Sequence, residues 1–338
     1  MWMARSMSDP SAMQPLDWTS FVGSWRLVPG WLAVVLLLAV GYGVLRVRSR
    51  SRSTVHPWRA GSFVLGCALL WVSVASGIGR YAMDLFWMHM VLHLLLIMVV
   101  PALLVLGHPI TVALESLSPG RQSRARSLVA SRAVGVLVHP ASGLVVYTVV
   151  IVGTHLTGFM DQMAMHPWLM PAEQVLYVVS GCLLFLPLLG EEPIRSDLGY
   201  LLRLVLFLLA MVPDTVVGIV LLQDTADPFP MMAEHHPSWA PPALSDVHTA
   251  GGLMWAVGDG LMMFAAVGLM ISVVTSPSKR ERMTGRWLDA VRSNVIATEV
   301  GADPARPLDP DSDDAYAAYN RMLQRLAAER GSDGDRSR

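Results

Sequence analysis

The sequence predicts an all-α polytopic membrane protein, a bundle of seven transmembrane helices, from its composition and from the pattern of its apolar runs. Of its 338 residues, 53% are hydrophobic and 15% are charged. The apolar residues collect in long runs such as "LLRLVLFLLAMVPDTVVGIVLL", and a helix needs about 20 such residues to span a bilayer. These runs do not alternate with polar residues, which excludes sheets and leaves helices as the spanning elements.

Seven segments are long and apolar enough to span a membrane, and we expect the transmembrane domain to occupy residues 28–276. The first span anchors the chain, because the residues before it lack the basic start and apolar core of a cleavable signal peptide. In chain order, the segments are residues 28–45, 58–77, 86–106, 135–157, 172–189, 198–222 and 247–274.

Basic residues gather in alternate connections, and this asymmetry predicts the orientation of the helices. Lys and Arg near spans are retained on the cytoplasmic side. The side with few of them has Arg5, Arg26 and Arg80, so we expect residues 1–27 to be an external amino-terminal segment and the carboxyl terminus to be cytoplasmic. The basic residues of the cytoplasmic side are Arg46, Arg48, Arg50, Arg52, Arg59, Arg121, Arg124, Arg126, Arg132, Arg195, Arg203, Lys279, Arg280, Arg282, Arg286 and Arg292.

The region after the last span, residues 277–338, differs in composition from the rest of the chain. It is basic at first and then acidic and proline-containing. We expect a cytoplasmic tail in which residues 311–330 form a short amphipathic helix and the remainder is disordered. Cys67 and Cys182 fall in different spans without a C-x-x-C motif, so we expect no disulfide.

Four histidines fall at one depth in the predicted topology, close to the outer surface. His89 and His93 begin helix three, His155 ends helix four and His248 opens helix seven. Residues four apart share one face of a helix, so His89 and His93 can direct two nitrogens to one point. Ionisable groups within spans are costly and usually functional, and the sequence therefore predicts a metal site made by these four histidines. In the alternative interpretation, each imidazole bonds to a carbonyl group or water at the interface.

Two carboxylates lie deeper in the predicted bundle. Asp214 in helix six and Asp259 in helix seven have no Lys or Arg at a similar depth, so each must be protonated, hydrogen-bonded or metal-bound. They are candidate auxiliary residues, as a polar floor below the histidines or as a proton path. Further acidic residues around the outer rim would attract cations, namely Asp84, Asp161, Glu173 and Asp246.

Methionines on the outer side indicate which metal the site would hold. Imidazole suits zinc, copper, iron and nickel, whereas thioether sulfur selects Cu(I). We therefore expect copper, with Cu(I) favoured, and name Met88, Met90 and Met254 as auxiliary ligands. Because only neutral imidazole binds a metal, we expect the affinity to fall below a pH of about 6.5.

Several other classes of membrane protein are disfavoured. A retinal protein needs a lysine in the last span, and the only lysine, Lys279, lies beyond it. The "HMVLH" stretch lacks the glutamate of a zinc protease. Desaturases carry several histidine boxes on the cytoplasmic side, whereas this chain has one H-x-x-x-H on the other side. A cytochrome with haem between His93 and His155 stays open as an alternative.

Four motifs together resemble a known family. "HMVLHLLLIMVVPALLVLGHPITVAL", "THLTGFMDQMAMHPWLMPAEQVLYVVSGCLLFLPLL", "PDTVVGIVL" and "DVHTAGGLMWAVGD" follow in the order seen in the CtaG-type cytochrome c oxidase assembly factors, which are seven-helix proteins of the bacterial plasma membrane. The resemblance covers about residues 30 to 275. It implies a protein needed for the copper centres of haem-copper oxidase that handles copper at the outer face.

Some positions match the pattern of the family and others depart from it. His89 and His93 correspond to the paired histidines of helix three, and His155 to the histidine that ends helix four. Leu92 and Leu94 stand where the family often has Gln and Met. Helix seven begins "DVHTAG" rather than D-Q-Q-x-A-G, and Asp214 stands where relatives often show histidine.

These observations predict that the protein binds and delivers a metal and catalyses no reaction. The protein would hold copper at the outer face of the bacterial plasma membrane and pass it to a cytochrome c oxidase subunit or to a copper chaperone on the periplasmic side. Its surroundings would be the lipid bilayer, and we expect no nucleic-acid partner. Two alternatives remain open: a transporter of copper or protons that uses Asp214 and Asp259, and a structural scaffold for oxidase assembly.

Overall fold

The computed structural model describes residues 14–51, 53–189, 192–194, 198–234 and 236–275, with isolated positions at 317, 320, 321 and 324. Every regular element among these residues is helical, which confirms the all-α prediction for the described part of the chain. The chain divides into two units, Met1–Leu269 and Met270–Arg338. The tail helix expected at 311–330, the disorder expected around it and the first part of the amino-terminal segment lie outside the described residues.

Six helical stretches are long and apolar enough to cross a membrane. They are α2 (Pro29–Ser49); α3 and α4 (Pro57–Ala75, Gly77–Tyr81); the run α5, η3, α6 and α7 (Phe86–Leu94, Leu95–Val99, Val100–Leu106, Pro109–Glu115); α12 (Leu169–Leu189); α13 (Tyr200–Gln223); and the run α15, η4 and α16 (Ala243–Leu253, Met254–Gly258, Asp259–Thr275). The shorter helices are α1 (Trp18–Gly23), α8 (Pro119–Val129), α9 (Arg132–Leu137), α10 (Pro140–His155), α11 (Phe159–Met165) and α14 (Pro230–Ala233). The chain is therefore a multi-pass membrane protein.

The fourth predicted span differs from the expectation. Residues 135–157 do not form one helix, because a new helix begins at Pro140, which lacks the amide proton needed in a helix interior. The resulting α10 has 16 residues and is therefore about 24 Å long, short of a hydrocarbon core of about 30 Å. It passes the test for a span only together with α11, to which it is bent by 64°. The described residues thus contain six candidate spans, or seven if the bent pair counts as one, and the count of seven and the orientation stay predictions.

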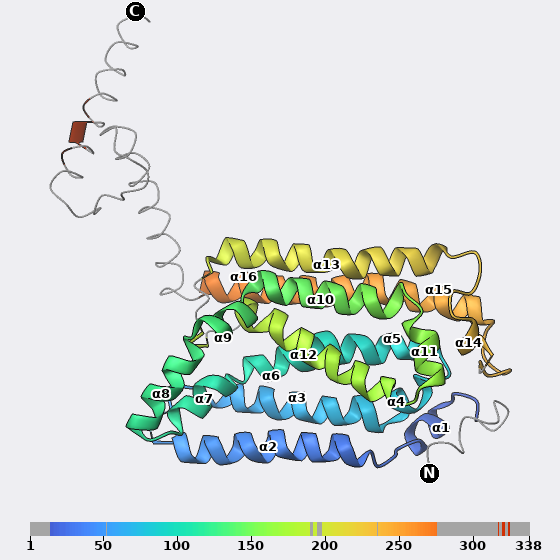
Figure 1. The fold of residues 1–338 in the computed structure, drawn as a ribbon, viewed down its shortest axis with the longest axis horizontal. Coiled ribbons are helices and arrows are strands. Elements are labelled where there is room, and N and C mark those ends of the chain that lie inside the picture. The colour runs from blue at the N-terminus through green and yellow to red at the C-terminus, as the bar shows by residue number, and fades with distance from the viewer. Residues whose placement is uncertain are drawn as a thin grey trace, which may run out of the picture. The chain divides into compact units, whose positions relative to one another are not determined.

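The run from α5 to α6 lies in the middle of the first unit (Figure 1). It packs against α3, α12 and α15, while α10 packs against α12 and α13. The short helices α7, α8 and α9 lie at one end of the bundle, and α1, α11 and α14 lie at the other. We call these the α7–α9 end and the α11/α14 end.

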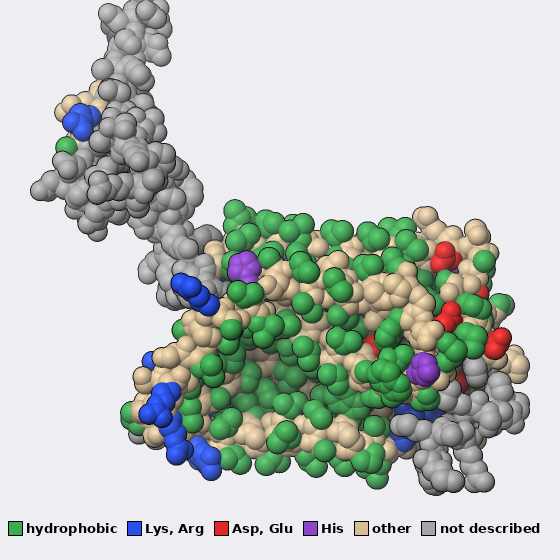
Figure 2. Space-filling view, in the orientation of Figure 1, with side chains coloured by type: hydrophobic (Ala, Val, Ile, Leu, Met, Phe, Trp, Pro, Cys, Tyr) green, Lys and Arg blue, Asp and Glu red, His purple; other side chains and the backbone are tan. Residues whose placement is uncertain are grey.

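The flanks of the bundle are apolar and its ends are polar. Hydrophobic side chains cover the visible flank, with basic side chains at the α7–α9 end and acidic ones at the α11/α14 end (Figure 2). Large apolar residues such as Leu37, Leu201 and Phe264 are more than 70% exposed. Such a surface suits lipid, which accepts apolar side chains and requires the backbone of each helix to satisfy its own hydrogen bonds.

Glycines allow the central helices to approach closely. A Cβ atom at Gly181 of α12 would overlap the backbone carbonyl of Ile97 in η3. At Gly143 of α10 it would lie 2.6 Å from the carbonyl oxygen of Leu183. Helix α12 is thereby held tightly between the central run and α10, the arrangement that membrane bundles reach with small residues.

The amino end of α5 is tied to α15 by a carboxylate. The residue before the helix, Leu85, makes no side-chain cap, and the first amides of a helix lack intrahelical partners. The buried carboxylate of Asp246 accepts hydrogen bonds from the amides of Phe86 at 2.7 Å and Trp87 at 2.9 Å. Asp246 therefore supplies the cap of α5 from a segment 160 residues away in the chain.

Substituting Gly181 with alanine should lower stability. The added methyl group meets backbone atoms that cannot rotate away, and overpacking of this kind costs about 1–3 kcal/mol. Thermal unfolding of the purified protein in detergent measures the loss. The matched control is Gly153→Ala in α10, where a Cβ meets no atom within 4 Å; equal melting of the two variants would contradict the tight packing.

Replacing Asp246 with alanine should also destabilise the bundle, by about 1–3 kcal/mol, because it removes a cap and leaves two buried donors unpaired. The same unfolding measurement applies. Ser245→Ala, at the neighbouring exposed position, should have almost no effect. An Asp246→Ala protein as stable as the Ser245→Ala protein would show that α5 does not need this carboxylate.

Candidate metal centre

Three of the four predicted histidines meet inside the bundle. His89 and His93 lie on one face of α5, and His155 is the last residue of α10. The ring centroids of His155 are 4.9 Å from His93 and 6.3 Å from His89. None of the three side chains is more than 2% exposed. We call these three residues the histidine cluster.

The nitrogens of the histidine cluster are largely without hydrogen-bond partners. Both ring nitrogens of His89 and of His93, and the Nε2 atom of His155, are buried and make no hydrogen bond. An unsatisfied buried polar atom costs about 1–3 kcal/mol, so several of them at one place need an explanation. A metal ion that accepts one lone pair from each ring would satisfy three of these five atoms.

His155 is oriented by its own helix. Its Nδ1 atom lies 2.9 Å from the carbonyl oxygen of Ile151, and a carbonyl can only accept. The proton is therefore on Nδ1, and the lone pair is on Nε2. Metal-binding histidines usually donate their second ring N–H to a carbonyl or carboxylate in this way.

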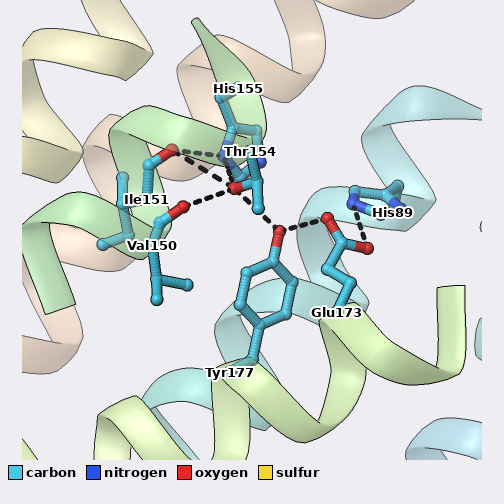
Figure 3. Close-up of polar contacts among 7 residues, drawn as sticks. All are labelled: His89, Val150, Ile151, Thr154, His155, Glu173 and Tyr177. Carbon is cyan, nitrogen blue, oxygen red and sulfur yellow. Dashed lines mark hydrogen bonds and ion pairs between the residues drawn. The ribbon is translucent and has the colours of Figure 1, made fainter. Parts of the chain in front are cut away.

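A carboxylate and a phenol from α12 complete the polar group (Figure 3). Glu173 is 1% exposed, and its Oε2 atom lies 3.5 Å from His89 Nε2, which is too long for a good hydrogen bond. Tyr177 donates to Glu173 Oε1 at 2.6 Å, and its ring centroid is 4.4 Å from that of His93. Thr154 lies 3.2 Å from the Tyr177 hydroxyl oxygen. The site is therefore built from α5, α10 and α12.

Glu173 was predicted to lie at the outer rim of the bundle, and the structure places it beside the histidine cluster. The packing of α12 against η3 and α6 cannot be read from the chain. One signal was present, because Glu173 and Tyr177 are four residues apart and so share one face of an apolar helix.

The spacing of the three rings is close to that of a metal site but wider. With each nitrogen about 2.1 Å from a metal, two imidazoles of a tetrahedral site have centroids about 5 Å apart. The pair His93 and His155 matches this spacing, whereas His89 and His155 are more than 1 Å too far apart. Among the described residues, no group of three or more His, Cys, Asp or Glu side chains is already arranged to hold a metal ion.

His248 does not join the histidine cluster. Its Nε2 atom lies 2.9 Å from the carbonyl oxygen of Asp224, in the connection that follows α13. The topology suggested that helix seven would contribute His248. The structure instead brings Asp246 of α15 to the amino end of α5, because that face of the helix packs on α5 while His248 points toward the neighbouring connection.

The predicted auxiliary methionines belong to two apolar clusters. Met88 packs in a small cluster with Tyr81 and Leu85, whereas Met90 and Met254 are fully buried in the main apolar core. Successive residues of a helix are about 100° apart around its axis, so the neighbours of His89 in the chain face other directions.

The two deep carboxylates form a separate polar group. Asp214 is fully buried and accepts a hydrogen bond from the Tyr147 hydroxyl at 2.6 Å. Asp259 accepts from Thr215 at 2.8 Å. One oxygen of each aspartate is buried without a hydrogen-bond partner. The contacts described for these residues do not extend to the histidine cluster.

A small recess, with room for about one water molecule, opens at the α11/α14 end. Its lining includes Asp84, Asp227, His236, Asp246 and Phe86. The ring of Phe86 is stacked on that of His89, with centroids 6.0 Å apart and planes 3° from parallel. The recess therefore reaches a residue that is in direct contact with the histidine cluster.

Comparison with known proteins gives relatives in mycobacteria. An uncharacterized protein of Mycobacterium leprae is 26% identical over 327 residues, which cover 93% of this chain and 46% of that protein. Uncharacterized proteins of Mycobacterium bovis and Mycobacterium tuberculosis are each 27% identical over 318 residues, covering 90% of this chain and 44% of theirs. The chain thus spans less than half the length of these relatives. No solved structure matches it.

A family model matches the larger part of the chain. It covers residues 39–276, from the middle of α2 to just past the end of α16, and so includes the histidine cluster, Glu173 and both deep aspartates. The family is described as the cytochrome c oxidase caa3 assembly factor family. The chain belongs to the cytochrome c oxidase caa3 assembly factor family.

Proposed function

We propose that this protein binds copper within the membrane and delivers it during cytochrome c oxidase assembly, at the outer face of the plasma membrane. One observation carries the proposal. Three buried imidazoles from α5 and α10 converge, and five of their six ring nitrogens make no hydrogen bond. Buried polar groups are nearly always hydrogen-bonded, so this cluster is better suited to a ligand than to a purely structural role.

Copper is the metal that fits both the ligands and the family. Imidazole suits zinc, copper, iron and nickel, and a role in the assembly of a haem-copper oxidase favours copper among these. Haem fits the site poorly. Two axial imidazoles on opposite sides of a haem iron need centroids about 6 Å apart or more, so the 4.9 Å between His93 and His155 disfavours haem between that pair.

The arrangement suits transfer rather than permanent storage. His93 and His155 have the spacing of a ligand pair, and His89 must approach by about 1 Å to complete a site of three nitrogens. A metal held by few ligands leaves more readily than one in a closed cage. No bond to carbon or oxygen is made or broken in this role, so we assign no catalytic residue.

The direction of delivery follows from the distribution of charge. The basic helix α8, with Arg121, Arg124 and Arg126, lies at the α7–α9 end, which the charge asymmetry predicts to be cytoplasmic. The α11/α14 end, near which the histidine cluster lies, is then external. The recipient would be an oxidase subunit or a copper chaperone on that side.

The combined substitution His89→Ala plus His93→Ala should remove bound copper. Two of three ligands are lost, and we expect copper per chain to fall at least tenfold, since weaker perturbations of metal sites already cost 10–100-fold in affinity. Elemental analysis of the purified protein measures this. His248→Ala is the matched control and should retain copper, because His248 contacts the Asp224 carbonyl instead. Unchanged copper in the double variant would reject the proposal.

A transporter is the second candidate, and the deep carboxylates favour it. Asp214 and Asp259 each keep a buried oxygen without a partner, and ionisable groups inside spans often mark ion pathways. Copper uptake into vesicles that contain the protein separates the two functions. Delivery at one face predicts no uptake above that of protein-free vesicles. Uptake that Asp259→Asn abolishes would establish transport instead.

A further inference from the structure

Glu173 places one buried carboxyl group beside the histidine cluster. Its carboxylate is buried, contacts His89 and accepts the Tyr177 hydroxyl proton in a hydrogen bond. No Lys or Arg forms an ion pair with it among the described residues. The other deep carboxylates, Asp214 and Asp259, are engaged with Tyr147 and Thr215 instead. Tyr177 keeps its proton while it donates, so it adds no second charge.

The site can therefore distinguish monovalent from divalent metal ions by their charge. Imidazole ligands are neutral, so the cluster itself contributes no charge. A net charge buried in an apolar region is expensive, whereas a paired and hydrogen-bonded one is tolerated. A monovalent cation beside Glu173 gives a neutral group. A divalent cation leaves one positive charge unbalanced in a place that is at most 2% exposed.

We infer that Glu173 is the counter-charge that matches the histidine cluster to a monovalent soft cation, which for copper is Cu(I). The inference rests on the proposed copper-binding function and adds the selectivity of the site. It does not depend on the thioether ligands Met88, Met90 and Met254, which stay a prediction from the sequence. Glu173 acts beside His89 as a positioned charge, and the nitrogens of the histidine cluster remain the ligands.

The hydrogen bonds around Glu173 hold its charge in place. Tyr177, four residues later on α12, donates to Oε1, which leaves Oε2 directed at His89. The single hydroxyl proton of Tyr177 goes to Glu173, so Thr154 Oγ1, at 3.2 Å, can bond to Tyr177 only as the donor, in competition with the Val150 carbonyl at 2.8 Å. This chain joins α12 to α10 through side chains whose positions are fixed by their own helices (Figure 3).

Metal titration with two redox-stable ions tests the inference. Ag(I) is a monovalent soft ion, and Zn(II) is a divalent ion that also takes imidazole. We expect the purified full-length protein in lipid nanodiscs to bind Ag(I) at least tenfold more tightly than Zn(II), measured by equilibrium dialysis and elemental analysis. Binding of Zn(II) as tight as that of Ag(I) would overturn the inference and leave the proposed function intact.

The variant Glu173→Gln removes the charge and keeps the shape of the side chain and an acceptor for Tyr177. We expect its affinity for Ag(I) to fall 10–100-fold. The matched control is Glu115→Gln, since Glu115 lies in α7 at the other end of the bundle and accepts from Thr54. An Ag(I) affinity equal to that of the wild type would also overturn the inference.

Adding a second charge gives the converse test. In Thr154→Asp, a new carboxylate next to Tyr177 should shift the preference toward Zn(II), and an unchanged preference for Ag(I) would count against charge matching.

If a variant fails to fold, the ratio of Ag(I) to Zn(II) affinity in the wild type still decides. Failure of the wild type to bind copper, Ag(I) or Zn(II) would overturn the proposed function and the inference together.

Discussion

Two hydrogen bonds from the first amides of α5 to Asp246 determine how the central helix sits in the bundle. A helix that begins inside an apolar environment must find partners for these amides, and only one carboxylate of α15 reaches them. With the start of α5 tied to α15, the His89 and His93 face of the helix is turned toward α10 and α12. The position of the histidine cluster is thus set by a residue that takes no part in it.

The polar groups of the bundle are of two kinds, and the contrast between them supports the proposed function. Carboxylates that cap helices are fully paired: Asp246 at α5, and Glu192, which accepts from Ile110 and Thr111 at the start of α7. Burial raises the pKa of Glu192, and those hydrogen bonds and Arg59 oppose the rise. The histidine cluster differs because five of its six ring nitrogens make no hydrogen bond. Structural needs account for the first kind and leave the second unexplained without a ligand.

Much of the fold could be predicted from the sequence, because continuous apolar runs and the requirements of lipid leave few alternatives to helices. The break at Pro140 was the exception, since a hydropathy window averages over a proline that starts a new helix. For the site, helix periodicity paired His89 with His93, and depth placed His155 beside them. Neither periodicity nor depth shows that α12, rather than α15, completes the site. Contacts between helices, such as that of Gly181 with η3, decide which helices are neighbours. Glu173 was therefore assigned to the rim, and His248 to the cluster.

The π-helical turn η3, directly after α5, has a consequence for the rest of this span. A π turn holds more residues than an α turn, and each residue advances an α-helix by about 100°. Removing one residue from Leu95–Val99 would convert the turn to regular helix and rotate everything beyond it relative to the histidines. Pro101, which approaches Gly181, would then face another neighbour. The direction in which the side chains of α6 point is therefore independent of the direction in which His89 and His93 point. One half of the span can present metal ligands while the other half packs against α12.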